Sequence, residues 1–218
     1  MRIHLKIKST DKIIPFDHQP LLVGCIHKWL GWNTIHGNVA LFSFSRLSNG
    51  KKIDDGLKFE HGSSLFISAY DNNLIKKLIK GIQQDSSMFY DLSVIEITIE
   101  PEPEFSNREI FHPASPILIS RKVNNKVDHI LYTDDRASQF LKETILTKMK
   151  ETDYFDDSFE IFFERSYPQA GTKLIKYKNV ENKANWCSVI IKGNEKTKHF
   201  IWNVGLGNST GIGFGAIY

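Results

Sequence analysis

The chain has 218 residues, 41% of them hydrophobic and 24% charged, which are the proportions of an ordinary globular protein of one or two domains. No apolar run approaches the roughly 18 residues of a membrane span, and two cysteines are too few for a disulfide framework or a zinc site. The first eight residues alternate as a strand does and do not resemble a secretion signal, so a cytoplasmic protein with no membrane partner is expected.

Charge is distributed unevenly along the chain. The formal net charge is +3, yet residues 165–218 hold eight Lys or Arg and only two Asp or Glu. The rest of the chain therefore carries twenty basic and twenty-three acidic residues. A basic C-terminal quarter favours a polyanionic partner, although any one of these lysines is equally well explained as an ordinary solvated side chain.

The first half predicts the order strand, helix, strand, strand, helix, strand, which is that of a ferredoxin-like unit. Alternating apolar residues indicate the strands, with Ile95, Ile97 and Ile99 expected to face inward, and helical spacing indicates the helices, the second capped by Asn72 or Asn73. The predicted strands cover about 1–8, 42–46, 64–70 and 92–100, and the helices cover 18–30 and a segment from 72 to beyond 82.

The two prolines and three glutamates of 100–104 break regular structure and predict a linker, so the expected domains are 1–104 and 105–218. The second half predicts a hairpin, then a helix from 134 or 135 to about 151, then four strands. The hairpin pairs 116–120 with 128–132, and the strands cover 159–163, 172–178, 186–192 and 199–204. We therefore expect an α+β fold of two tandem ferredoxin-like domains with a glycine-rich C-terminal hairpin.

The last fourteen residues contain five glycines at alternating or near-alternating positions, Gly205, Gly207, Gly211, Gly213 and Gly215. In a hairpin this spacing places glycines on one face and Leu206, Ile212 and Phe214 on the other. The bare face would let another backbone, or a phosphate, approach closely. A dinucleotide-binding loop needs a following helix, for which no residues remain. A flexible tail is the other alternative, and the apolar residues between the glycines argue against it.

Two histidines could form a general acid–base pair. His27 lies one turn before the end of the first predicted helix, and His36 lies in the loop that follows. On RNA, one imidazole can deprotonate a 2′-hydroxyl while the other protonates the leaving 5′-oxygen, and no metal is required. Taken alone, a helix histidine and a loop histidine are more often a surface residue and a turn partner.

Other charged residues give weaker signals. The pairs 54–55, 134–135 and 156–157 are aspartates in turn or capping contexts, so they predict caps as readily as metal ligands. No P-loop, zinc spacing or serine nucleophile motif is present. Basic side chains of the last quarter could line a phosphate track, with Lys176 and Lys178 on one face of a strand. The candidates are Arg165, Lys173, Lys176, Lys178, Lys192, Lys196 and Lys198.

Two stretches resemble the CRISPR-associated endoribonucleases that process repeat RNA, within the superfamily of repeat-associated RNA-binding (RAMP) proteins. They are the helix and loop of 18–47, which include His27, His36 and the Phe-rich strand, and the glycine-rich 204–215. The resemblance implies one metal-independent cut in CRISPR repeat RNA, the precursor of guide RNA, leaving a 2′,3′-cyclic phosphate and a 5′-hydroxyl. It implies no cofactor, and a CRISPR effector complex and a homodimer are further candidate partners.

The resemblance also implies site residues. His36 matches the position of the family's key histidine and is assigned as general base, with His27 as general acid, although the opposite assignment is nearly as plausible. The glycines and Arg165, Lys173, Lys176 and Lys178 are expected to bind RNA. Many members have a lysine just before the Phe-rich strand, where this chain has Ala40. Lys28, Lys51 and Lys52 are candidates for the missing charge, but none is in register.

Two other functions stay open. The superfamily also contains non-catalytic RNA-binding subunits of effector complexes, and Ala40 favours that alternative. A pair of ferredoxin-like domains could instead bind a protein or a small ligand, which the basic C-terminal quarter disfavours.

Overall fold

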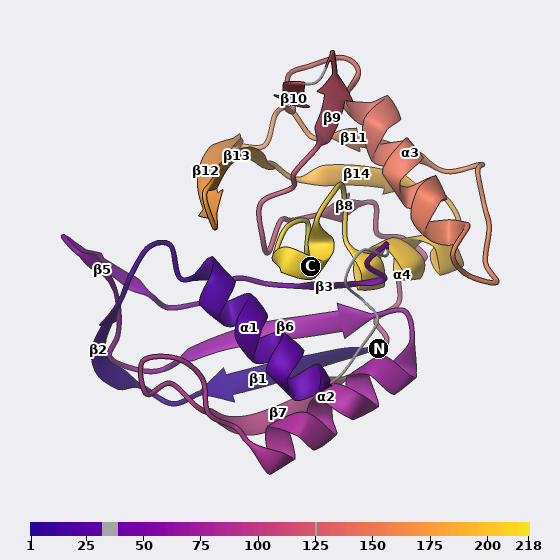
Figure 1. Ribbon diagram of the computed structural model, residues 1–218. Helices are drawn as coiled ribbons and strands as arrows, with labels where there is room; N and C mark the ends of the chain where they lie inside the picture. Colours follow the sequence, from indigo (N-terminus) through magenta and orange to yellow (C-terminus); the bar gives the residue numbers. More distant parts are fainter. Residues whose placement is uncertain (32–38, 125) are drawn as a thin grey trace.

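The N-terminal half is a four-stranded antiparallel sheet with two helices on one face (Figure 1). The computed structural model describes residues 1–31, 39–124 and 126–218. The strand order β3-β6-β1-β7 is that of a ferredoxin-like unit, as the sequence predicted. The elements are β1 (Arg2–Ile7), α1 (Gln19–Leu30), β3 (Phe42–Phe44), β6 (Ser63–Ala69), α2 (Asn72–Gln84) and β7 (Val94–Glu100).

A second, small sheet in this half was not predicted. It has the order β2-β5-β4 and is built from β2 (Thr10–Ile14), β4 (Lys51–Ile53) and β5 (Gly56–Phe59). These strands are short and polar, and they lack the alternation that identifies a half-buried strand.

The inward orientation predicted for the isoleucines of β7 is wrong for two of the three. Ile95 and Ile99 are 57% and 54% exposed, and only Ile97 packs against the core. The register against β1 shifts between Lys6 and Ile7, so Val94 rather than Ile95 pairs with Ile7. Because β7 is an edge strand, its apolar side chains are covered on one side only. The cap of α2 also differs, since Asp71 accepts a hydrogen bond from the backbone of Asn73.

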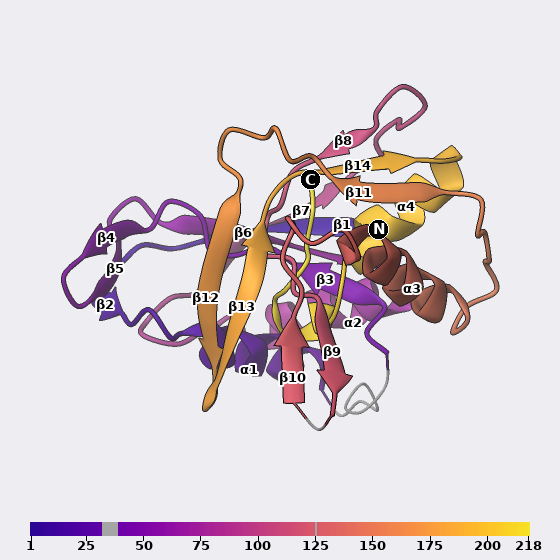
Figure 2. The same ribbon diagram turned by 90° about the horizontal axis from the view of Figure 1, so that it is seen from above.

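The C-terminal half repeats the ferredoxin-like order in a less regular form. Its sheet has the order β11-β14-β8, and a bridge between Pro113 and Ile217 adds the end of the chain beside β8. Two hairpins, β9–β10 and β12–β13, project from it (Figure 2). The elements are β8 (Ile110–Phe111), β9 (Ser120–Val123), β10 (Lys126–His129), α3 (Ala137–Met149), β11 (Glu160–Phe163), β12 (Gly171–Tyr177), β13 (Val180–Trp186), β14 (Val189–Lys192) and α4 (Glu195–Val204).

One predicted strand of this half is a helix. Residues 199–204 belong to α4, whose N-cap Asn194 accepts a hydrogen bond from the backbone of Thr197 at 2.9 Å. A contiguous run such as Phe200-Ile201-Trp202 fits a buried strand and a buried helix equally well, and the capping asparagine was the missed signal. The first hairpin is confirmed, with its strands at 120–123 and 126–129. The predicted strand 186–192 begins later, at Val189, because a separate strand β13 precedes it.

The two halves have separate hydrophobic cores, and both apolar and polar side chains cross between them. Buried residues between 3 and 94 form one core, and buried residues between 105 and 217 form the other. The predicted boundary at 104/105 falls between these cores and stays a prediction. No helix in the described part of the chain is both long and apolar enough to cross a membrane.

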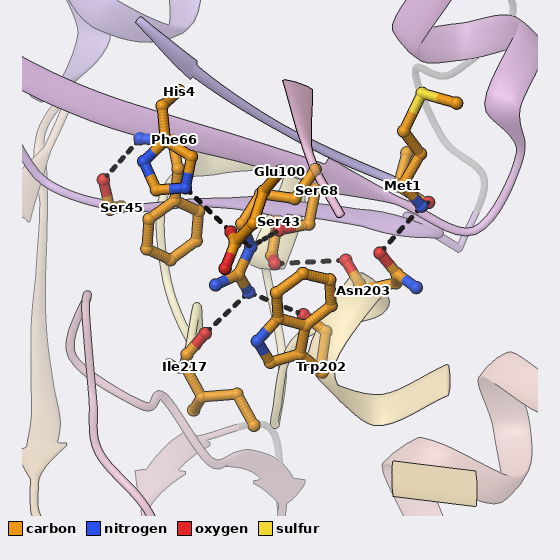
Figure 3. A network of polar contacts seen from close by, with 12 residues as sticks. Met1, His4, Ser43, Ser45, Phe66, Ser68, Glu100, Trp202, Asn203 and Ile217 are labelled. Atoms are coloured by element: carbon orange, nitrogen blue, oxygen red, sulfur yellow. Dashed lines mark hydrogen bonds and ion pairs between the residues drawn. The ribbon is translucent and has the colours of Figure 1, made fainter. Parts of the chain in front are cut away.

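Arg2 of β1 contacts both halves, and Figure 3 labels its partners Phe66, Ser68, Trp202 and Ile217. Its guanidinium lies between the rings of Phe66 and Trp202, 3.8 and 3.5 Å from their centroids. It donates hydrogen bonds to the carbonyl oxygens of Trp202 at 3.1 Å and Ile217 at 2.8 Å, and to Ser68 Oγ at 2.7 Å. The side chain is 2% exposed, so one arginine of the first strand holds α4 and the segment around Ile217.

Candidate functional site

A cavity of about 560 Å³ lies where the two halves meet beside the glycine-rich segment. Its walls come from α1, from the residues before β3, from β9, from α3 and from residues 207–212. The lining residues are His27, Val39, Ala40, Arg121, Glu143, Thr144, Thr147, Lys148, Gly207, Asn208, Ser209, Thr210, Gly211 and Ile212. Figure 1 shows the C-terminal segment, in yellow, between the two sheets.

The glycine-rich segment is a compact loop that closes on itself, and the predicted alternation of faces is wrong. Residues 210–212 form a 3₁₀ turn, and the Leu206 N–H donates to the Gly215 carbonyl at 2.8 Å. Gly207 has φ +70°, and a methyl group added there would collide with the Leu118 carbonyl oxygen. A methyl at Gly213, with φ +93°, would collide with the Gln19 side chain. These glycines therefore permit close approach of the protein's own backbone and side chains.

Both halves of the molecule hold this loop. From α1, Gln19 Nε2 donates to the Ile212 carbonyl at 2.7 Å. From the other half, the Asn208 N–H donates to the Leu118 carbonyl at 2.7 Å, and Asn208 Oδ1 accepts from the Ser120 N–H at 2.9 Å. The loop is thus fixed to both halves, and the shape of the cavity depends on how the halves are oriented.

The predicted histidine pair is described only in part. His27 lies in the last turn of α1, is partly buried and lines the cavity. His27 follows Val23 by four residues and precedes Leu30 by three, so it lies at the edge of the buried face of α1. His36 lies outside the described residues. Ala40 lines the cavity and is the nearest side chain to Gly211, so the position expected to hold a lysine does face this site.

The three lysines predicted to replace that missing charge lie elsewhere. Lys28 Nζ bonds to Asp85 Oδ2 at 2.8 Å and to the Ser87 carbonyl at 2.6 Å, on a surface away from the cavity. Lys51 and Lys52 are exposed on β4 of the small sheet. None of the three is among the residues that line the cavity.

Two cations that the sequence reasoning missed do line the cavity. Arg121 donates to the Phe140 carbonyl at 3.1 Å and forms an ion pair with Glu143 at 3.2 Å. Lys148 of α3 is 4% exposed. A signal for Lys148 was present, because it continues the buried stripe of Leu141 and Ile145 at helical spacing.

The basic residues predicted on β12 lie on a hairpin that reaches from the C-terminal half to α1 (Figure 2). Lys173 and Lys176 are exposed, while Tyr177 packs against the core of the N-terminal half. Lys178 lies in the turn with φ +54°, so the prediction that it shares a strand face with Lys176 is wrong. Arg165 forms an ion pair with Asp135 at 2.9 Å.

The aspartate pairs have structural partners. Arg136 holds the pKa of Asp134 at about 2, and Asp135 pairs with Arg165. Asp156 accepts hydrogen bonds from Ser158, Thr197 and Asn194. Asp134 and Asp135 are therefore ion-pair partners, and Asp156 is a hydrogen-bond acceptor. The predicted start of the helix at 134 or 135 is slightly early, because Arg136 is the N-cap of α3 and makes no side-chain cap hydrogen bond.

A second hollow, of about 810 Å³, lies between the halves and is lined by other residues. Arg46, Trp186 and Tyr218 contribute to it, as do Arg2 and Phe66. Burial lowers the pKa of the Arg46 guanidinium, and no carboxylate in the described part of the chain forms an ion pair with it. The His4 ring, which also lines this hollow, is held by Glu100 at 2.7 Å.

Tandem ferredoxin-like units with a glycine-rich C-terminal loop define a protein of the repeat-associated RNA-binding type. The family model described as "CRISPR associated protein Cas6, C-terminal" matches residues 100–218, more than half of the chain. The chain therefore belongs to the Cas6 family. A comparison with curated proteins found no match.

Solved structures resemble the whole chain at low sequence identity. One is described as "CRISPR associated protein Cas6", with a TM-score of 0.85, 19% identity, and coverage of 100% of this chain and 98% of that one. A Cas6-related protein from Pyrococcus furiosus has a TM-score of 0.84 at 21% identity, covering 100% and 97%. A RAMP protein described as binding different RNA substrates has 0.83 at 20%, covering 100% and 98%. At these identities the likeness establishes the fold.

Proposed function

We propose that the protein binds CRISPR repeat RNA and cuts the precursor once per repeat by attack of a 2′-hydroxyl. The observation that carries this proposal is the cavity in which His27 faces a glycine-rich loop and two cationic side chains, Arg121 and Lys148. Membership of the Cas6 family and the description of one structural neighbour as an RNA-binding RAMP protein support it.

The proposed reaction needs two proton transfers and no redox partner. His36 takes the proton of the 2′-hydroxyl, the 2′-oxygen forms a bond to phosphorus, and the bond from phosphorus to the 5′-oxygen breaks. His27 gives its proton to that 5′-oxygen. The products are a 2′,3′-cyclic phosphate and a 5′-hydroxyl, and a cation beside the phosphate stabilises the charge that develops on its oxygens.

The second hollow supports an RNA partner. Arg46 offers a partly desolvated guanidinium without a carboxylate partner among the described residues, and Trp186 and Tyr218 offer aromatic surface. Single-stranded RNA binds to surfaces that combine cations for its phosphates with rings for its bases. We include this hollow, with Lys173, Lys176 and Lys178 on the neighbouring hairpin, in the RNA path.

The test is cleavage of a labelled CRISPR repeat RNA from the same genome, in EDTA, with a companion RNA that carries one 2′-deoxy nucleotide at the cut. We expect a single cut that the deoxy substitution abolishes. His27→Ala and His36→Ala should each slow it by at least about 100-fold, the low end for general acid–base groups, while RNA binding survives. His61→Ala, an exposed histidine of the same half, is the matched control. Cleavage within threefold of the unmodified protein in both variants would refute the mechanism.

A non-catalytic RNA-binding subunit of an effector complex is the second candidate. Ala40 favours it, because a small apolar side chain faces the cavity where a lysine was expected. Tight RNA binding without a cut would select this function. The other predicted partners, an effector complex and a second copy of the chain, are tested by copurification and by light scattering.

A further inference from the structure

Lys148 is a buried lysine whose ammonium group is bonded to the base of the glycine-rich loop. Its Nζ donates to the Val204 carbonyl at 2.9 Å, to the Gly205 carbonyl at 3.0 Å and to Thr210 Oγ1 at 3.2 Å. The first two acceptors are the last residue and the C-cap of α4, and the third begins the 3₁₀ turn. One side chain thus holds the start and the middle of the loop together.

The charge of Lys148 is not balanced by an adjacent carboxylate. The charged or titratable side chains that line the same cavity are His27 of α1, Arg121 of β9 and Glu143 of α3, and the loop contributes none. Glu143 is already paired with Arg121. Burial lowers the pKa of Lys148 to about 7.

We propose that Lys148 is a positioning residue that, in its protonated form, fixes the glycine-rich loop for RNA and supplies the positive charge that position 40 lacks. The inference rests on the proposed RNA-binding function and adds a residue and a proton requirement to it. An ammonium has three N–H donors, which match the three acceptors at this site.

Loss of the proton weakens both roles. A neutral amine has two N–H groups and a lone pair, so the contact to Thr210 survives only if its hydroxyl turns to donate, and the bonds to the two carbonyl oxygens lose the strengthening that the positive charge gives them. The positive potential beneath the cavity disappears at the same time. By linkage, a phosphate that favours the protonated form must raise the pKa of Lys148 when it binds.

The experiment measures RNA affinity against pH with a repeat RNA that carries a 2′-deoxy nucleotide at the cut, so that no cleavage occurs. Each variant is compared with the unmodified protein at the same pH, which cancels titrations that the two proteins share, including those of His27 and His36. The variants are Lys148→Met, Lys148→Arg and the matched control Lys150→Met, an exposed lysine at the C-cap of the same helix.

We expect Lys148→Met to bind RNA at least about 5-fold more weakly at pH 6, the lower end for coupling between two sites, and the difference to shrink toward pH 9. Lys148→Arg, which stays charged, should bind better than the unmodified protein at pH 9. Lys150→Met should show a small deficit that is independent of pH. A Lys148→Met deficit that is constant from pH 6 to 9 would mean a merely structural role and would overturn the inference.

The unmodified protein provides a second test if Lys148→Met does not fold. Its lysine Cε and Nζ NMR signals, with Lys148 assigned through Lys148→Arg, should titrate near pH 7 and shift to higher pH when repeat RNA binds. An unchanged pKa on RNA binding overturns the inference. RNA binding that is absent at every pH refutes the proposed function as well, whereas pH-linked binding without cleavage upholds Lys148 and selects the non-catalytic candidate.

Discussion

The two halves of the molecule share one order of strands but differ in how regular the sheet is and in what extends from it. The N-terminal half completes a four-stranded sheet with two helices on one face, whereas the C-terminal half pairs only three named strands and extends two hairpins and a glycine-rich loop. Those extensions reach toward the other half, where Tyr177 packs against its core and Ile212 accepts a hydrogen bond from Gln19. The regular half provides a rigid surface, and the irregular half builds the site upon it.

The largest expected effect comes from breaking the contact between the halves. Arg2→Met should lower the free energy of unfolding by about 3 kcal/mol, because two buried carbonyl oxygens lose their donor and a desolvated cation–π contact is lost. Chemical denaturation measures it. Arg136→Met is the matched control, since Arg136 is an exposed arginine paired with Asp134, and it should change stability little. Equal losses in both variants would show that Arg2 does not hold the halves together.

A substitution in the glycine-rich loop should lower the free energy of unfolding almost as much. Gly207→Ala should cost about 2 to 3 kcal/mol, because its φ is positive and the added methyl would collide with the Leu118 carbonyl. It should also weaken RNA binding. Gly171→Ala, in the same half but with open space around it, should stay within about 0.5 kcal/mol. Unchanged stability in Gly207→Ala would mean that the loop can rearrange freely.

The pH dependence of the unfolding free energy should reveal the contribution of Lys148. Its folded pKa is about 7, below the value of about 10.4 in an unfolded chain, so between these values the unfolded state holds more protons. Unfolding free energy should therefore rise with pH in this window, by up to about 1 kcal/mol per pH unit from this group. Denaturation at pH 7, 8 and 9 should show the contribution as a difference from Lys148→Met. Parallel curves would place the folded pKa near its ordinary value.

The smallest expected effect is an increase in stability from a substitution in the N-terminal half. Gly24 of α1 has open space around it and a helical backbone, so Gly24→Ala should raise stability by about 0.5 to 1 kcal/mol. Gly81 of α2 is its counterpart, because a methyl group there would collide with the Trp29 carbonyl where the two helices cross. Thermal melts should move in opposite directions for Gly24→Ala and Gly81→Ala.

The periodicity of apolar residues predicted the helices, which are determined by residues close together in the sequence. It did not predict contacts between side chains that are far apart in the sequence. α1 and α3 were predicted to within a few residues because apolar spacing defines an amphipathic helix. His27 lines the cavity, and its catalytic role stays a prediction. The conformation expected for the loop glycines was wrong, because residues 210–212 form a 3₁₀ turn. The burial of Lys148 could have been inferred from its helical spacing, but the partners of Lys148 and Arg2 could not, because they lie 56 to 62 and up to 215 residues away.

The position of Arg2 has a consequence for the order in which the protein can assemble. Its carbonyl partners, on Trp202 and Ile217, follow it by 200 and 215 residues. At about 5 to 20 residues per second, a ribosome needs roughly 10 to 40 s to make that stretch. Throughout that time Arg2 can bond to Ser68 and stack on Phe66, but its two carbonyl partners do not yet exist. The contact between the halves therefore stays incomplete until residues 202–217, which flank and include the glycine-rich loop, have been made.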